Sequence, residues 1–226
     1  LRGGVPVVFP WFGAGPSGDR TPSHGFARTA AWRREAVRNE LATSGPLVVR
    51  YGLNEAGLDS APFTAELTLS FAPTRFEVSL RVVNTGSDVF RYEEALHTYL
   101  AVSGIDAVRV EGLTGCPYLD KADGGGADEI VQAGSVSFTG EVDRVYRHGG
   151  EAVVVDPGWS REILLGKQGS ANTVVWNPGP VKGPALADVG PHWTDFVCVE
   201  AGNVRDAAIE LAPGEEHILT QTIRLR

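Results

Sequence analysis

Short runs of alternating polarity constrain the fold of this chain more than any other feature. In residues 75–84 (RFEVSLRVVN), apolar side chains alternate with charged or polar ones as far as Val82. A period of two predicts a strand with one buried face. Residues 65–71 (AELTLSF) alternate in the same way, and the intervening APT (72–74) predicts a hairpin turn. NTGSD (84–88) predicts the next turn.

The same pattern continues along the second half of the chain. Its β-branched and aromatic runs are SVSFTG, EAVVVDPG, REILLGK, NTVVWNPG, DFVCVEAG and HILTQTIRLR. Turn residues are frequent, with 28 Gly and 14 Pro, and no segment shows a convincing helical period, although residues 30–41 come closest. Regular short strands predict an all-β sandwich or barrel-like stack of sheets. We find no repeat or linker and expect one domain over residues 1–226, with loops at 122–129 and 177–193, the latter long enough to be functional.

Composition excludes several classes of function. The 226 residues carry a net charge of −8, whereas a large nucleic-acid interface needs a basic excess, so we expect no nucleic-acid partner. No apolar run reaches the roughly 18 residues of a membrane helix, so we expect no membrane partner. Two Cys without metal-binding spacing indicate reduced thiols and a cytoplasmic protein. Because the chain has no Met and begins with LRGG, we interpret it as lacking a preceding segment.

Two motifs near the beginning combine arginine with glycine. In LRGGVPVVFPWFG, Arg2 precedes two Gly residues that allow close approach of a ligand to the backbone. In SHGFAR (23–28), His24 and Arg28 flank a short Gly-Phe-Ala segment. Arginine suits a planar anion or a phosphate, because it binds with two parallel hydrogen bonds. At this point an exposed arginine beside an ordinary turn explains the first motif equally well, and it explains SHGFAR somewhat better than a binding role does.

His97 lies within RYEEALHTYLAV, which reads as one strand. Strand alternation places it on the face of Glu93 and Tyr99, whereas Leu96 and Leu100 point the other way. This less apolar face favours a cleft, although an isolated histidine in a strand is more often structural. Glu200 ends the run FVCVE, which suggests a carboxylate at the rim of a sheet, either functional or paired in a salt bridge.

A histidine and a glutamate on separate strands are the minimum for general acid–base catalysis. The sequence has no P-loop, dinucleotide fingerprint or nucleophile elbow. Its five His are scattered without HxH or HExxH spacing, so we expect no metal site.

Six motifs in a fixed order carry a resemblance over nearly the whole chain: RGGVPVVFPWFG, HGFAR, EEALHTYL, DRVY, VVWNPGP and FVCVEAGNV. In these motifs the sequence resembles the glucose-6-phosphate 1-epimerases, or hexose-6-phosphate mutarotases, a branch of the aldose 1-epimerase superfamily. The resemblance implies a large antiparallel β-sandwich of the galactose-mutarotase type, with N-terminal strands that precede the present chain. It also implies an isomerase that interconverts the α and β anomers of a hexose 6-phosphate without a cofactor.

The resemblance also assigns roles to individual residues. His97 corresponds to the general acid that protonates the ring oxygen, and Glu200 to the general base at the anomeric hydroxyl. Arg2 and Arg28 correspond to substrate-binding arginines, with the phosphate as partner. Asp143 of DRVY corresponds to a carboxylate that holds sugar hydroxyls.

Other positions carry less definite implications. His24 lies beside the site by motif, and Ser23 stands where relatives often have a longer Gln. Ala201 stands where relatives often have Thr, which bears on specificity more than on the reaction. Two alternatives stay open: a carbohydrate-binding homologue without activity, and an epimerase of unphosphorylated sugars. We expect a monomer.

Overall fold

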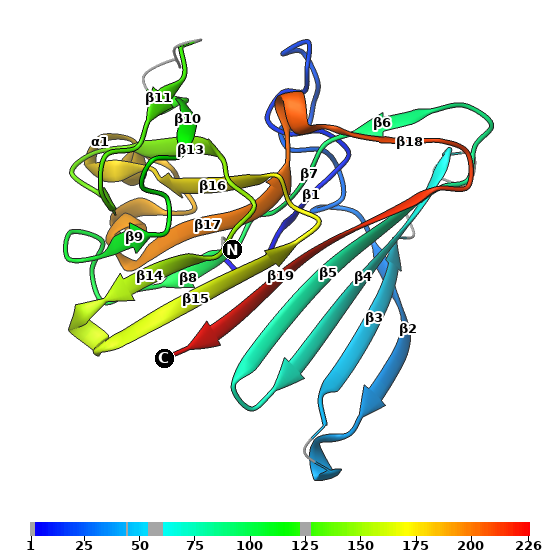
Figure 1. Ribbon diagram of the computed structural model, residues 1–226, viewed down its shortest axis with the longest axis horizontal. Coiled ribbons are helices and arrows are strands. Elements are labelled where there is room, and N and C mark those ends of the chain that lie inside the picture. Colours follow the sequence, from blue (N-terminus) through cyan, green and yellow to red (C-terminus); the bar gives the residue numbers. More distant parts are fainter. Residues whose placement is uncertain (1–2, 44, 54–60, 123–127) are drawn as a thin grey trace.

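The computed structural model describes residues 3–43, 45–53, 61–122 and 128–226. Strands dominate these residues (Figure 1). The strands are β1 Val7–Val8, β2 Trp32–Asn39, β3 Leu47–Leu53, β4 Phe63–Ala72, β5 Arg75–Asn84, β6 Phe90–Tyr92, β7 Glu94–Leu96, β8 Tyr99–Ala101, β9 Arg109–Glu111, β10 Pro117–Asp120, β11 Ile130–Val131, β12 Val136–Ser137, β13 Val142–Arg147, β14 Ala152–Asp156, β15 Arg161–Gln168, β16 Asn172–Asn177, β17 Phe196–Asn203, β18 Ile209–Leu211 and β19 Glu216–Leu225. The helices are α1 Gly179–Ala185 and the 3-10 turns Leu41–Thr43, Pro157–Trp159, Gly190–Asp195 and Arg205–Ala207.

Two large antiparallel sheets form the architecture. The first has the order β1-β7-β17-β16-β13-β10-β11, with β8 also paired to β17, and the second has the order β12-β9-β14-β15-β19-β5-β4-β3-β2. In Figure 1 the nine-stranded sheet runs across the lower part of the molecule, and the eight-stranded sheet lies at the upper left. The all-β expectation is thus confirmed, and so is the hairpin between β4 and β5.

Alternation along the strands explains how the sheets pack. Val197 and Val199 of β17 join Val154 of β14 and Leu165 of β15 in one buried cluster between the sheets. A second cluster around Leu80 and Leu219 continues this core along β5 and β19. Each inward residue is followed by one that points to the opposite face.

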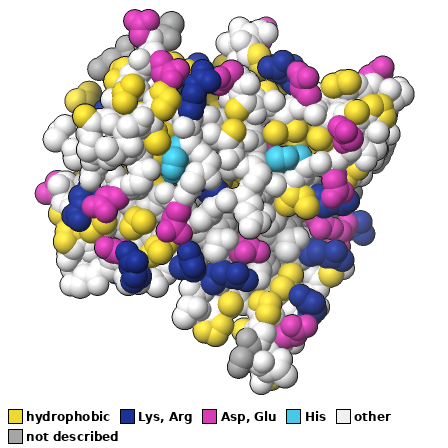
Figure 2. Space-filling model, viewed as in Figure 1, with side chains coloured by type: hydrophobic (Ala, Val, Ile, Leu, Met, Phe, Trp, Pro, Cys, Tyr) yellow, Lys and Arg dark blue, Asp and Glu magenta, His cyan; other side chains and the backbone are white. Residues whose placement is uncertain are grey.

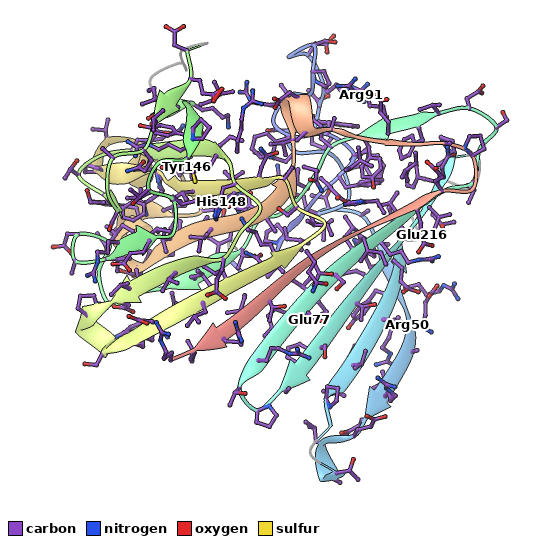
Figure 3. All side chains as sticks on the ribbon, viewed as in Figure 1. Arg50, Glu77, Arg91, Tyr146, His148 and Glu216 are labelled. Atoms are coloured by element: carbon purple, nitrogen blue, oxygen red, sulfur yellow. The ribbon has the colours of Figure 1, made fainter. Side chains whose placement is uncertain are left out.

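The outer face of the nine-stranded sheet carries interspersed charges of both signs (Figure 2). Ion pairs cross it, among them Arg50–Glu66 at 3.7 Å and Arg81–Glu216. Arg50, Glu77 and Glu216 mark this face in Figure 3. Exposed ion pairs of this kind contribute little to the stability of the fold.

Two sequence-based assignments need correction. The strand expected across RYEEALHTYLAV is interrupted at Glu93 and again at His97 and Thr98, where the backbone N–H of Thr98 turns back to donate to Leu96 O (2.8 Å). The loop expected over 177–193 contains α1 and most of the 3-10 turn Gly190–Asp195, each with Pro near its first position. The loop expected at 122–129 lies mostly outside the described residues. Within the described residues, no helix has the length and apolarity to cross a membrane.

Candidate active site

The outer face of the eight-stranded sheet gathers the candidate catalytic residues. On β17, Cys198 and Glu200 point away from the core that receives Val197 and Val199. Glu200 pairs in register with Val174 on β16, and the strand continues to Asn203. The prediction that Glu200 closes its strand at a sheet rim is therefore wrong. The residues after it are small and turn-like, yet they pair with β7, so Glu200 lies inside the sheet.

His97 lies directly beside Glu200. The two side chains approach to 3.4 Å between His97 Nε2 and Glu200 Oε1, with 11% and 1% of their surfaces exposed. The break between β7 and β8 presents His97 on the accessible face, as alternation predicted. Behind it, Thr98 points into the core and hydrogen bonds to the buried Gln221 of β19. Gln221 also donates to Val199 O at 2.9 Å, so one side chain fixes the backbone beside both residues.

The environment of Glu200 favours its neutral form. Complete burial raises the pKa of Glu200 well above its ordinary value of 4.5, and the negative charge of Asp143 raises it further. The positive charge of Lys121 acts in the opposite direction. A carboxyl group tuned upward in this way can exchange protons near neutral pH.

Asp143 reaches the same face from β13. Its two carboxylate oxygens each lie 3.2 Å from Lys121 Nζ. The ammonium group of Lys121 also lies 4.8 Å from the centre of the Phe12 ring. Asp143 thus lies on the face of Glu200 with a cationic partner, and its contact with sugar hydroxyls stays a prediction.

Aromatic rings surround the His97 imidazole. Tyr99 stacks on it at 4.9 Å with an interplanar angle of 11°, and Trp176 meets it edge-on at 5.8 Å. A pocket of about 260 Å³ lies beside this cluster along Tyr99 and Phe196, with Asp188 and His192 in its wall, and its lining includes neither His97 nor Glu200. Aromatic faces beside polar groups suit the apolar faces and hydroxyls of a sugar.

The HGFAR motif places His24 in this site. Its backbone has φ 67°, and Gly25 follows with φ 72° so close to Phe9 that an added Cβ would lie 2.0 Å from Phe9 O. Glycine is therefore required there. The His24 ring packs edge-on against Phe12 at 4.9 Å and against His97 at 5.9 Å.

The remaining candidates are not all brought together. Ser23 and Arg28 are exposed, and the Arg28 guanidinium donates to the backbone oxygen of Ser23. Arg2 lies outside the described residues. In the part of the chain that the structure describes, no three His, Cys, Asp or Glu side chains are grouped to hold a metal ion.

Sequence reasoning missed Lys121 and Gln221 as parts of the site, and it gave no role to Phe12 and Tyr99, although both lie in the quoted motifs. A lysine after a strand looks like an ordinary solvated residue, and a buried Gln gives no motif. Trp176 lies in the quoted VVWNPGP motif, which was the one available signal for it.

Comparisons with known proteins identify the family of this chain. Residues 1–224 match the family model described as aldose 1-epimerase. A Cenchrus ciliaris protein named "Putative glucose-6-phosphate 1-epimerase" is 33% identical over 96% of this chain and 68% of its own length. An Escherichia coli protein of the same name is 30% identical over 100% of this chain and 74% of its own.

A solved structure gives the same result for the fold. The crystal structure titled "putative mutarotase (YeaD)" from Salmonella typhimurium superimposes with a TM-score of 0.85 at 31% identity. The match covers 100% of this chain and 74% of the other. The sandwich fold, the paired His97 and Glu200, and these matches agree: the chain belongs to the aldose 1-epimerase family and is an epimerase.

Proposed function

We propose that the protein interconverts the α and β anomers of a hexose 6-phosphate, with glucose 6-phosphate as the first candidate. Family membership supports the reaction, and the names of the Cenchrus and Escherichia coli relatives support the phosphorylated substrate. The contact between His97 and Glu200 carries the proposal, because it joins a proton donor and a proton acceptor on the outer face of one sheet.

Both oxygens that exchange protons in this reaction are bonded to C1 of the sugar. The two protein groups must therefore lie close together, as the 3.4 Å between His97 Nε2 and Glu200 Oε1 allows. Glu200 as carboxylate takes the proton of the C1 hydroxyl, while the bond from C1 to the ring oxygen breaks. Protonated His97 gives its Nε2 proton to that ring oxygen, which leaves an open-chain aldehyde.

Rotation about C1–C2 exposes the other face of the aldehyde. Neutral His97 then takes back the proton of the C5 hydroxyl, and Glu200 returns its proton to the aldehyde oxygen as the ring closes. No proton is gained or lost over the cycle. Asp143 accepts hydrogen bonds from sugar hydroxyls, and Tyr99 and Trp176 restrict the ring.

We assign the phosphate to Arg2 and Arg28 on the strength of the sequence resemblance. Arg28 is exposed and projects from the segment that carries His24, so its guanidinium is accessible to an anion near the site. Variants Arg2→Ala and Arg28→Ala should each reduce kcat/KM for glucose 6-phosphate by roughly tenfold or more, with little change for glucose.

Anomer exchange measured by NMR on glucose 6-phosphate and on glucose tests the function. The proposal expects exchange well above the buffer rate, with a preference for the phosphorylated sugar. Equal rates on both sugars in the wild type and the arginine variants would identify an epimerase of unphosphorylated sugars. Binding without exchange would identify a non-catalytic carbohydrate-binding homologue.

We also propose a cytoplasmic monomer. Cys116 is half-buried and Cys198 buried, and no disulfide joins these two thiols, which suits a reducing compartment. Light scattering at several protein concentrations tests the oligomeric state, and fractionation of the source cells tests the location.

A further inference from the structure

Lys121 reaches the site face through a fixed backbone. It follows β10, whose residue Asp120 pairs in register with Arg144 of β13. The backbone N–H of Lys121 donates to Asp143 O at 2.7 Å, which extends the pairing by one residue. Since Asp120 turns inward to Arg144, the next side chain turns outward, toward Asp143.

The Lys121 ammonium group is held on two sides. Its Nζ lies 3.2 Å from both oxygens of Asp143 and 4.8 Å from the Phe12 ring centre. Phe12 is itself fixed, because its backbone N–H donates to the buried carboxylate of Glu93 at 2.9 Å. Only 24% of the Lys121 side chain and 15% of that of Asp143 are exposed, so water screens the pair weakly.

Charge near Glu200 makes this pair important for catalysis. Among the described residues, His97 contacts Glu200, and the charges of Asp143 and Lys121 act on it from β13 and from the end of β10. Asp143 alone would be a second carboxylate beside a buried base, which disfavours the ionised form of that base. The ammonium of Lys121 opposes this effect.

We propose that Lys121 is a positioning residue of the reaction: it holds Asp143 in place for the sugar hydroxyls and offsets its charge, so that Glu200 can be an anion when substrate binds. This rests on the proposed function, because it takes Glu200 as the base. Lys121 needs no contact with the substrate for this role, since it acts through Asp143.

The test compares Lys121→Met with Lys121→Arg, which keeps the charge. The pH profile of kcat/KM for anomer exchange reports the ionisation of the base in the free enzyme. In Lys121→Met the acidic limb should move upward by roughly one pH unit or more, with the rate approaching wild type at higher pH. Lys121→Arg should keep the limb near the wild-type position. Lys182→Met, which removes an exposed lysine paired with Glu141 at 2.7 Å, should leave the limb unmoved.

A double variant separates the charge effect from simple loss of structure. Adding Asp143→Asn to Lys121→Met removes the carboxylate that Lys121 offsets, so the acidic limb should return toward the wild-type position even though KM rises. An unmoved limb in Lys121→Met, with KM raised about tenfold, would overturn the proposal in favour of direct substrate binding. A rate lowered equally at every pH would overturn it as well.

A measurement without substrate keeps this proposal distinct from the proposed function. Infrared difference spectra between each protein and its Glu200→Gln variant follow the Glu200 carboxyl directly during titration. In the Lys121→Met variant, the Glu200 carboxyl should titrate at a higher pH than in the wild type. If the wild type exchanges no anomers, the proposed function fails, while an unchanged Glu200 titration contradicts the role of Lys121 by itself.

Discussion

Gln221 of one sheet donates a hydrogen bond to the backbone oxygen of Val199 in the other, at 2.9 Å. Val199 immediately precedes Glu200, and the same Gln221 side chain bonds to Thr98, which immediately follows His97. One buried amide on the inner face therefore supports the backbone next to both His97 and Glu200, the proposed catalytic pair on the outer face.

Gln221→Leu tests this support. It removes both bonds and leaves Val199 O and the Thr98 hydroxyl buried without that partner, which should cost about 1–3 kcal/mol of unfolding free energy. Because His97 and Glu200 lose their common support, kcat should fall by roughly tenfold or more. Thr220→Val on the same strand loses a 2.8 Å bond to Ser79. It should lower stability with kcat unchanged; equal kcat in both variants would refute the role of Gln221.

His97→Asn and Glu200→Gln test the proton-transfer pair itself. Each should reduce kcat by roughly 100-fold or more, because general acid–base catalysis contributes factors of that size. Circular dichroism should show an unchanged fold. Glu216→Gln, which alters an exposed glutamate paired with Arg81 on the outer face of the other sheet, is the matched control. Near-normal turnover in either site variant would remove the role assigned to that residue.

Glu200 should also reduce the stability of the folded protein. Its folded pKa is raised by burial, so the folded state holds the proton longer than the unfolded state does. The cost is absent below the ordinary pKa of 4.5 and grows as pH rises toward the folded pKa. Glu200→Gln should thus be more stable than wild type at pH 8, by about 1 kcal/mol or more, and equal to it near pH 4. Denaturant unfolding at the two pH values measures the unfolding free energies of wild type and Glu200→Gln. If the variant is more stable by the same amount at both pH values, ionisation of the buried Glu200 is not the cause.

Local pattern was sufficient for most of the fold. Alternation in residues 75–84 predicted β5 and its buried face, and APT predicted the β4–β5 turn. The break at His97 was not predictable in the same way. Thr98 turns back to donate to Leu96 O, while the N–H groups of His97 and Tyr99 donate to Pro6 and Gly4, which are distant in sequence.

The site was predictable where a motif marked it. His97, Glu200 and Asp143 were found by motif, and they do lie on one face. Lys121 and Gln221 were missed because their importance comes from partners on other strands, Asp143 and Val199, that no local pattern reveals. The position of Glu200 inside its strand was misjudged for the same reason, since pairing with β7 extends β17 beyond it.

His217 on β19 points to the same, core-facing side of its strand as Leu219 and Gln221. Its Nε2 lies 3.1 Å from Oε1 of the buried Glu94 and 2.9 Å from Gly169 O. The hydrogen bond with Glu94 raises the pKa of His217 above 6.5, although partial burial opposes this. Protonated His217 therefore stabilises the fold fully below pH 6.5, and this contribution is lost as pH rises through the folded pKa.

His217→Gln should remove that pH dependence. Between pH 6 and pH 9 the melting temperature of the wild type should fall relative to that of the variant. A loss of about 1 kcal/mol in unfolding free energy corresponds to a fall of roughly 2–4 °C. His192→Gln, at an exposed pair with Asp195, should follow the wild-type curve. If the melting temperatures of wild type and His217→Gln change in parallel over this pH range, the Glu94–His217 pair makes no pH-dependent contribution to stability. Because Glu94 and His97 belong to one short segment, anomer exchange measured on the same samples shows whether loss of the pair also disturbs His97.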